Sequence, residues 1–183
     1  ASSTSGLINA CAIFVLSASV RFASTINEST TETGSLHHGY AIFGSLTPSA
    51  VIEGKTGSAS YTGTLIGDFA PVSGSIEKGA INGTISMTAN FDAQTISGAL
   101  DMNHGAQPWA APTFTALPIQ PRSIDGKSAS FEGAFNAASG PFGSITGAFM
   151  GPSGQETVGR FDYFKNSSAP DDGLAVGVFQ AKR

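Results

Sequence analysis

Apolar and polar side chains alternate along much of this chain, most strictly in residues 81–90 and 94–102. Successive side chains of a β-strand point to opposite faces, so each run predicts a strand with one buried and one solvated face. Only Phe91-Asp92-Ala93 separates the two runs, which predicts an antiparallel hairpin with a tight connection at Asp92-Ala93. The same period recurs in 57–68, 128–136, 143–150, 155–164 and 174–181, and prolines restrict a further strand within 112–124 to an edge or broken strand.

Glycine lies inside these strands, mostly on the apolar face, where it normally weakens a strand. The positions are Gly63, Gly67, Gly83, Gly98, Gly133, Gly147, Gly159 and Gly177. Small residues relieve crowding where a sheet coils sharply, so their repetition predicts closure of a few strands into a narrow barrel. We therefore expect an all-β fold with a small, closed, antiparallel barrel of about eight strands, whose interior is filled by side chains.

Two other kinds of barrel fit the pattern less well. A membrane-spanning barrel has an apolar outer band and aromatic girdles, whereas here the polar faces are rich in Ser and Thr, and Trp109 is the only tryptophan. A lipocalin-like carrier has a hollow lumen, which the phenylalanines on the apolar faces argue against.

The sequence divides into a short β-rich N-terminal segment, residues 1–54, and a barrel domain, residues 55–183. In the first part we expect an apolar strand or hairpin over 7–23, a short strand around 38–43 and a connector near Pro48.

The single cysteine, Cys11, excludes an intramolecular disulfide. Its apolar neighbours predict a small buried side chain, whereas Ile8-Asn9-Ala10-Cys11 faintly resembles a lipid-anchor motif. The surrounding apolar run, residues 7–20, is too short for a membrane-spanning helix.

Charge and composition narrow the function. Charged residues make up only 12%, against roughly 25% in typical soluble proteins. The net charge is −4 and Lys and Arg form no cluster, which excludes nucleic-acid binding. Ser, Thr and Gly predominate instead, and the polar start at Ala1–Ser5 is typical of a terminus left by signal cleavage. We expect a secreted protein or one on the outer cell surface.

Catalytic patterns are absent from the sequence. It contains no nucleophile elbow, no HExxH and no glycine-rich phosphate loop before a helix. We therefore expect a binding or assembly module rather than an enzyme, without a bound metal.

Four segments carry a family resemblance: 57–64 (GSASYTGT), 81–98 (INGTISMTANFDAQTISG), 147–161 (GAFMGPSGQETVGRF) and 177–183 (GVFQAKR). In this order they resemble the C-terminal β-barrel domain of the transferrin-binding protein B-like family of Gram-negative surface lipoproteins and secreted haemophores, over about residues 55–183. The resemblance implies an eight-stranded antiparallel barrel, export across the outer membrane, and binding of a host iron protein, haem or another surface partner through loops and an N-terminal region.

The histidines are candidate haem ligands. His37 and His38 are adjacent in an expected strand and point to opposite faces, so the two cannot share one metal. His38 together with His104 or Met102 would supply axial ligands to haem iron. The alternative is that these are solvated loop histidines, with no cofactor bound.

The stretch from Asn103 to Pro112 is expected to be an exposed loop that contains the only tryptophan. Accessible aromatic anchors often lie at the centre of recognition sites. We predict partner contacts by His104, Gln107 and Trp109. The alternative is that Trp109 plugs one end of the barrel.

The apolar N-terminal strand supports a second function, a structural subunit of a surface filament or adhesin. A terminal strand adds to the sheet edge of another subunit through main-chain hydrogen bonds, which would give a homo-oligomer or polymer. The residues expected to do so are Leu7, Ile8, Ile13, Phe14, Val15 and Leu16.

Overall fold

The structure, a computed structural model, describes residues 9–15, 20–28, 36–71, 79–120, 128–136, 143–165 and 172–183, with side chains from Tyr40 onward. The chain forms two compact units that divide between Gly44 and Ser45. This division precedes residue 54, where the sequence places the boundary, because the segment from Ser45 to Gly54 belongs to the barrel unit.

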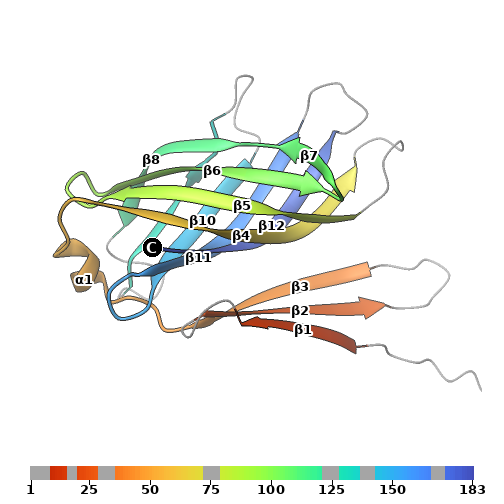
Figure 1. Cartoon of the computed structure of the whole chain (residues 1–183), viewed down its shortest axis with the longest axis horizontal. Coiled ribbons are helices and arrows are strands. Elements are labelled where there is room, and N and C mark those ends of the chain that lie inside the picture. Colours follow the sequence, from red (N-terminus) through yellow and green to blue (C-terminus); the bar gives the residue numbers. More distant parts are fainter. Residues whose placement is uncertain are drawn as a thin grey trace, which may run out of the picture. The chain divides into compact units, whose positions relative to one another are not determined.

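The N-terminal unit contains an antiparallel three-stranded sheet in the order β1-β2-β3 (Figure 1). The strands are β1 (Asn9–Val15), β2 (Val20–Glu28) and β3 (Leu36–Gly44). β1 and β2 form a hairpin in the region where the apolar run predicts a strand or hairpin.

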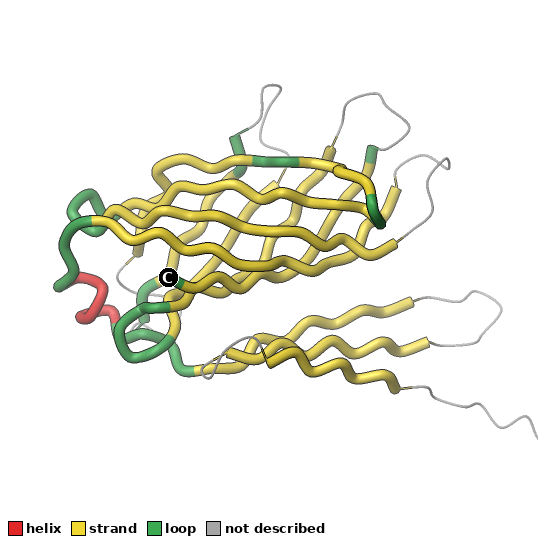
Figure 2. Tube along the Cα trace, in the orientation of Figure 1, coloured by secondary structure: helices red, strands yellow, loops and turns green. Residues whose placement is uncertain are grey.

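The C-terminal unit is a closed antiparallel barrel of eight strands, which confirms the predicted fold (Figures 1 and 2). The strands are β4 (Ser58–Pro71), β5 (Gly79–Asn90), β6 (Thr95–His104), β8 (Thr113–Gln120), β9 (Ser130–Ala134), β10 (Gly143–Met150), β11 (Glu156–Lys165) and β12 (Gly173–Lys182). They pair in the order β5-β4-β12-β11-β10-β9-β8-β6, and pairing of β6 with β5 closes the ring. The extra strand, β7 (Gln107–Ala110), pairs with the end of β6.

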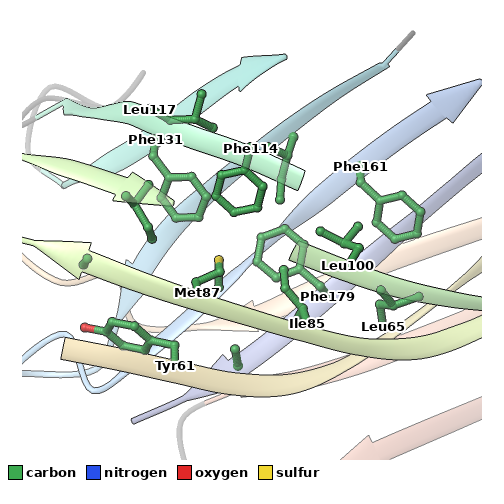
Figure 3. Close-up of a cluster of buried hydrophobic side chains, with 14 of the residues drawn as sticks. Tyr61, Leu65, Ile85, Met87, Leu100, Phe114, Leu117, Phe131, Phe161 and Phe179 are labelled. Carbon is green, nitrogen blue, oxygen red and sulfur yellow. The ribbon is translucent and has the colours of Figure 1, made fainter. Parts of the chain in front are cut away.

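Bulky apolar side chains fill the barrel interior (Figure 3), and glycines on neighbouring strands make room for them. The largest fully buried side chains are Tyr61, Phe69, Phe114, Phe131, Phe149 and Phe179. Four glycines pair across strands with phenylalanine: Gly98 with Phe114, Gly147 with Phe131, Gly159 with Phe179 and Gly177 with Phe161. A Cβ at position 177 would lie 2.7 Å from Cζ of Phe161, well inside van der Waals contact. The prediction that these glycines relieve crowding in a filled barrel is confirmed.

The segment before β4 closes one end of the barrel. The short helix α1 (Ser49–Glu53) contributes Ile52, which is fully buried. Just before the helix, Thr47 donates its hydroxyl to the carbonyl of Gly151 (2.6 Å) and its N–H to the carbonyl of Phe149 (2.9 Å). The sequence predicts only a connector here, and these bonds explain why the connector is part of the barrel unit.

Tyr61 joins β4 to the turn between β10 and β11 at the same end. Its hydroxyl donates to the carbonyl of Gly154 at 2.7 Å. Burial raises the pKa of Tyr61 to about 12, against the smaller opposing effect of the positive charge of Arg183. Arg183 is itself held there, because its N–H donates to the carbonyl of Gln155 at 2.9 Å.

The predicted loop over 103–112 is wrong for most of its length, because β6 and β7 form a tight hairpin up to Ala110, but the tip of this hairpin, residues 105–108, is exposed as predicted. Gly105 occupies the left-handed position of its turn (φ 61°). β7 and β8 both pair with β6, β7 near its end and β8 nearer its start. The pairing of β8 with β6 has a register shift between Ile96 and Gly98, and Ala116 of β8 has a left-handed backbone (φ 52°). This interruption agrees with the broken strand that the prolines predict.

Among the described residues, no helix combines the length and the apolar composition that crossing a membrane would require.

Candidate functional site

Chemically diverse side chains converge at the barrel end opposite α1. Here the end of β4 meets the start of β5, β6 turns into β7, and the end of β11 meets the start of β12 (Figure 1). Inward positions near these strand ends bring together five side chains, which we call the mouth cluster: Phe69, His104, Trp109, Tyr163 and Lys165.

Trp109 is the centre of the mouth cluster. Its side chain is only 6% exposed, with edge-on ring contacts to Phe69 (5.2 Å between centroids) and Tyr163 (6.0 Å). The Nζ of Lys165 donates to the carbonyl of Trp109 at 3.0 Å and lies 6.0 Å from the centre of its ring. The predicted partner contact assumed an accessible ring, and that assumption is wrong. The position of Trp109 matches the alternative, a side chain that plugs one end of the barrel.

His104 lies in the same cluster and is half-buried. Its ring centroid is 4.7 Å from that of Phe69, and Gly79 leaves space for it, since a Cβ at position 79 would lie 2.5 Å from Nε2 of His104. Met102 lies two residues earlier on the same inward face of β6 and is 2% exposed. The structure thus places both candidate ligands on one face, but haem iron at Met102 would have to displace the packed core.

The third candidate ligand, His38, lies in β3 of the N-terminal unit. Its side chain is outside the described ones, so haem ligation by His38 with His104 or Met102 stays a prediction.

Gln107 lies at the tip of the β6–β7 hairpin. Residues 105–108 are exposed, and the register places Gln107 opposite His104. Of the three predicted partner contacts, Gln107 is therefore the one that presents its side chain to solvent. The hairpin holds this side chain on a paired strand rather than on a long loop.

Sequence reasoning did not single out Lys165 as part of a site. In β11, however, Phe161, Tyr163 and Lys165 occupy alternate positions and therefore share the inward face. The period-2 pattern that identifies the strand also predicts this orientation. An inward lysine becomes interpretable only when it is known to lie at the end of the barrel, where its stem covers apolar rings while its amine reaches a carbonyl.

Part of the predicted strand-addition segment lies in β1. Ile13, Phe14 and Val15 pair with Ala23, Phe22 and Arg21 of β2 in the same chain. Leu7, Ile8 and Leu16 lie outside the described residues. Assembly through this strand stays a prediction, and so does any role of Cys11, whose backbone lies in β1.

The outer surface of the barrel carries a shallow groove of about 500 Å³ over β4, β5 and β6. Most of the residues that line it are small, and five of them are serines or threonines: Ser60, Thr62, Ser86, Thr88 and Ser97. None of the lining residues is charged. Within the described parts of the chain, no three His, Cys, Asp or Glu side chains are grouped so that they would hold a metal ion.

Comparisons with known proteins agree with the barrel architecture. The family described as C-lobe and N-lobe beta barrels of Tf-binding protein B matches residues 54–183. The fold is similar to that of intact Ap-TbpB (N and C lobes), with TM-score 0.61 and 15% identity over 98% of this chain and 39% of that chain. It is also similar to the vaccine antigen TbpB of Haemophilus parasuis, solved as a double mutant, with TM-score 0.58 and 18% identity over 90% of this chain and 32% of that chain.

A third similar structure is isotype 1 TbpB from serogroup B Neisseria meningitidis, with TM-score 0.53 and 19% identity over 94% of this chain and 36% of that chain. This chain therefore spans between 32% and 39% of the length of these three proteins. No curated protein sequence matches it.

Proposed function

This chain belongs to the family of β-barrels of transferrin-binding protein B, and from that premise we propose that it is a protein-binding module at the outer surface of a Gram-negative cell or secreted from it. Membership confirms the family predicted from the sequence. The solved relatives are named for transferrin binding, which supports an iron-carrier protein as the partner and a role in iron acquisition.

The filled interior is the observation that favours a protein as the partner over a small molecule. Leu100, Phe131 and Phe179 are each fully buried along the inside of the barrel. Small-molecule sites generally need a concave space of several hundred Å³ (~300–1,000 Å³), and inside the barrel that volume is taken up by phenylalanine side chains. The groove over β4, β5 and β6 has a comparable volume, but it is shallow and open to solvent. Recognition is then left to outer faces, strand ends and hairpin tips. This arrangement supports a non-catalytic, surface-to-surface interaction.

We place part of the partner contact at the tip of the β6–β7 hairpin. Gln107 is exposed there, and its amide supplies both a donor and an acceptor. Behind the tip, the rings of Trp109 and Phe69 hold the hairpin against the barrel. A polar group presented on a rigid support loses little conformational entropy on binding.

The proposal is tested by surface plasmon resonance with immobilised iron-loaded transferrin. We expect saturable binding by the full chain, weakened about fivefold, close to 1 kcal/mol, by Gln107→Ala. Thr84→Ala, an exposed residue on the outer face of β5, is the matched control and should bind as the wild type does. Absence of binding at ~100 μM chain would overturn transferrin as the partner.

A further inference from the structure

Two exposed aliphatic side chains lie together on the outer face of β12. Among the described residues the large exposed apolar side chains are Phe43, Leu46, Leu174 and Val176. Leu174 and Val176 are two residues apart on one strand, 40% and 42% exposed, whereas Ala175 between them faces inward and is fully buried. They therefore form one continuous apolar surface rather than two scattered side chains.

Acidic residues flank this surface on both sides. Val176 pairs with Asp68 of β4 and with Asp162 of β11. Directly paired residues of neighbouring strands have Cβ atoms about 5 Å apart, so both carboxylates border Val176. Leu174 pairs in the same way with Ala70 and Phe164, which extend the apolar surface. We call Leu174 and Val176 with Asp68 and Asp162 the acid-flanked strip.

The acid-flanked strip differs from the rest of the described outer face. On β4 and β5 the outward positions are mainly small polar residues such as Thr62, Thr64, Thr84 and Ser86, all exposed. Such positions suit a solvated surface. Aliphatic side chains at the equivalent positions of β12 leave apolar area exposed to water. Removing that area from water is favourable by about 25 cal/mol for each Å². That area is available to a partner.

The charged groups around the strip indicate which charge such a partner would carry. Asp162 accepts hydrogen bonds from the N–H (3.2 Å) and the hydroxyl of Ser144. No cation is paired with Asp162 among the described residues, and Arg160 lies on the same face of β11 toward Val178, away from Leu174. A purely apolar partner would desolvate Asp162 without compensation, and an acidic one would be repelled.

Building on the proposed function, we infer that the acid-flanked strip is a docking surface for a protein segment that presents an aliphatic side chain next to a basic one. The aliphatic side chain covers Val176 and Leu174. A lysine or arginine on the segment then forms an ion pair with Asp162 at the rim, where it gives specificity and a faster encounter.

The inference is tested on the full chain with a probe of this chemistry, a nine-residue peptide alternating lysine and valine. Titration followed by ¹⁵N NMR should shift the amides of β12 and the facing parts of β4 and β11. Val176→Ser should raise the Kd at least about fivefold, and Asp162→Asn about threefold with a weaker dependence on salt. Thr84→Ala is the control.

The outcomes separate this inference from the proposed function. A peptide alternating glutamate and valine should not bind. Equal binding of both peptides, or amide shifts confined to other faces of the barrel, would overturn the inference that the acid-flanked strip is a docking surface. A dimer that Val176→Ser dissociates in size-exclusion chromatography identifies a second copy as the occupant and also overturns it. If only transferrin binding fails, transferrin is refuted as the partner, and the peptide titration still decides whether the acid-flanked strip is a docking surface.

Discussion

The ring of Phe131 lies over Gly147, its partner across β9 and β10, in the space that a side chain at position 147 would occupy. The three atoms nearest to that missing Cβ all belong to the ring, and all three would lie within 2.9 Å of it. Glycine has no side chain that could pack in the barrel interior, and an aromatic ring from a neighbouring strand fills the space above it instead. Phe131 is itself fully buried and contacts Phe149 and Phe179, so Gly147 sets the position of several rings.

Gly147→Ala should therefore destabilise the protein. The added methyl group would overlap the Phe131 ring, and relief requires a shift of a packed core, which typically costs about 1–3 kcal/mol. Urea unfolding followed by circular dichroism measures the change. Thr64→Ala, exposed on the outer face of β4, should change the free energy of unfolding by only about 0.5 kcal/mol or less.

The second substitution Phe131→Leu tests the cause. If ring overlap is responsible, Gly147→Ala should cost less in the Phe131→Leu background than in the wild type, with an interaction energy of about 1 kcal/mol. Additive effects would contradict the packing explanation.

The alternation and its glycines were sufficient to predict the barrel. In a strand, the position of a residue is enough to predict the face on which its side chain lies, so the pattern over 81–90 places Ile85 and Met87 on the face opposite to Thr84 and Ser86, as the structure does. The cross-strand partners are a different matter, because they depend on register between distant segments. Nothing local in the sequence pairs Gly159 with Phe179, and bulges such as that between Ile96 and Gly98 shift the register without a strong signal.

The mouth cluster was only partly predictable for a similar reason. The sequence identifies Trp109 and His104 as candidate contact residues, but it places both in an exposed loop over 103–112. Pairing of β7 with β6 instead turns the ring of Trp109 inward. The role of Lys165 depends on a contact across 56 residues of sequence, which no local pattern encodes.

Tyr61 predicts a specific loss of stability at high pH. Below pH 10 its hydroxyl is protonated in both the folded and the unfolded chain. Between pH 10 and about 12 the unfolded chain releases this proton while the folded chain retains it, since burial raises the pKa of Tyr61 to about 12. The free energy of unfolding should therefore fall as pH rises through this window, by about 1 kcal/mol per pH unit at most.

The comparison with Tyr61→Phe isolates this contribution from other titrating groups. At pH 8 the variant should be less stable by about 1 kcal/mol, because the hydrogen bond to Gly154 is lost. Urea unfolding at pH 8, 10 and 11 should show the difference narrowing with pH. A constant difference across the series would contradict the raised pKa.

Trp109 is the only tryptophan, so its fluorescence reports on the mouth cluster alone. With its side chain 6% exposed, we expect quenching by acrylamide to be several-fold weaker in the folded chain than in the chain unfolded in urea. Lys165→Ala should increase quenching, because it removes the hydrogen bond to Trp109 and the stem that lies beside the ring. Equal quenching of folded and unfolded wild type would show that the ring is accessible.

Two buried threonines should respond in opposite directions to the same substitution. Thr157 and Thr47 are both fully buried, but the hydroxyl of Thr157 has no hydrogen-bond partner among the described residues, whereas that of Thr47 donates to Gly151. Valine keeps the shape and removes the hydroxyl. Thr157→Val should therefore raise the free energy of unfolding by about 1 kcal/mol, while Thr47→Val should lower it by about 1–2 kcal/mol because the Gly151 carbonyl loses its donor. Urea unfolding of both variants at pH 7 checks the signs, and destabilisation by Thr157→Val would mean that its hydroxyl is hydrogen-bonded in solution.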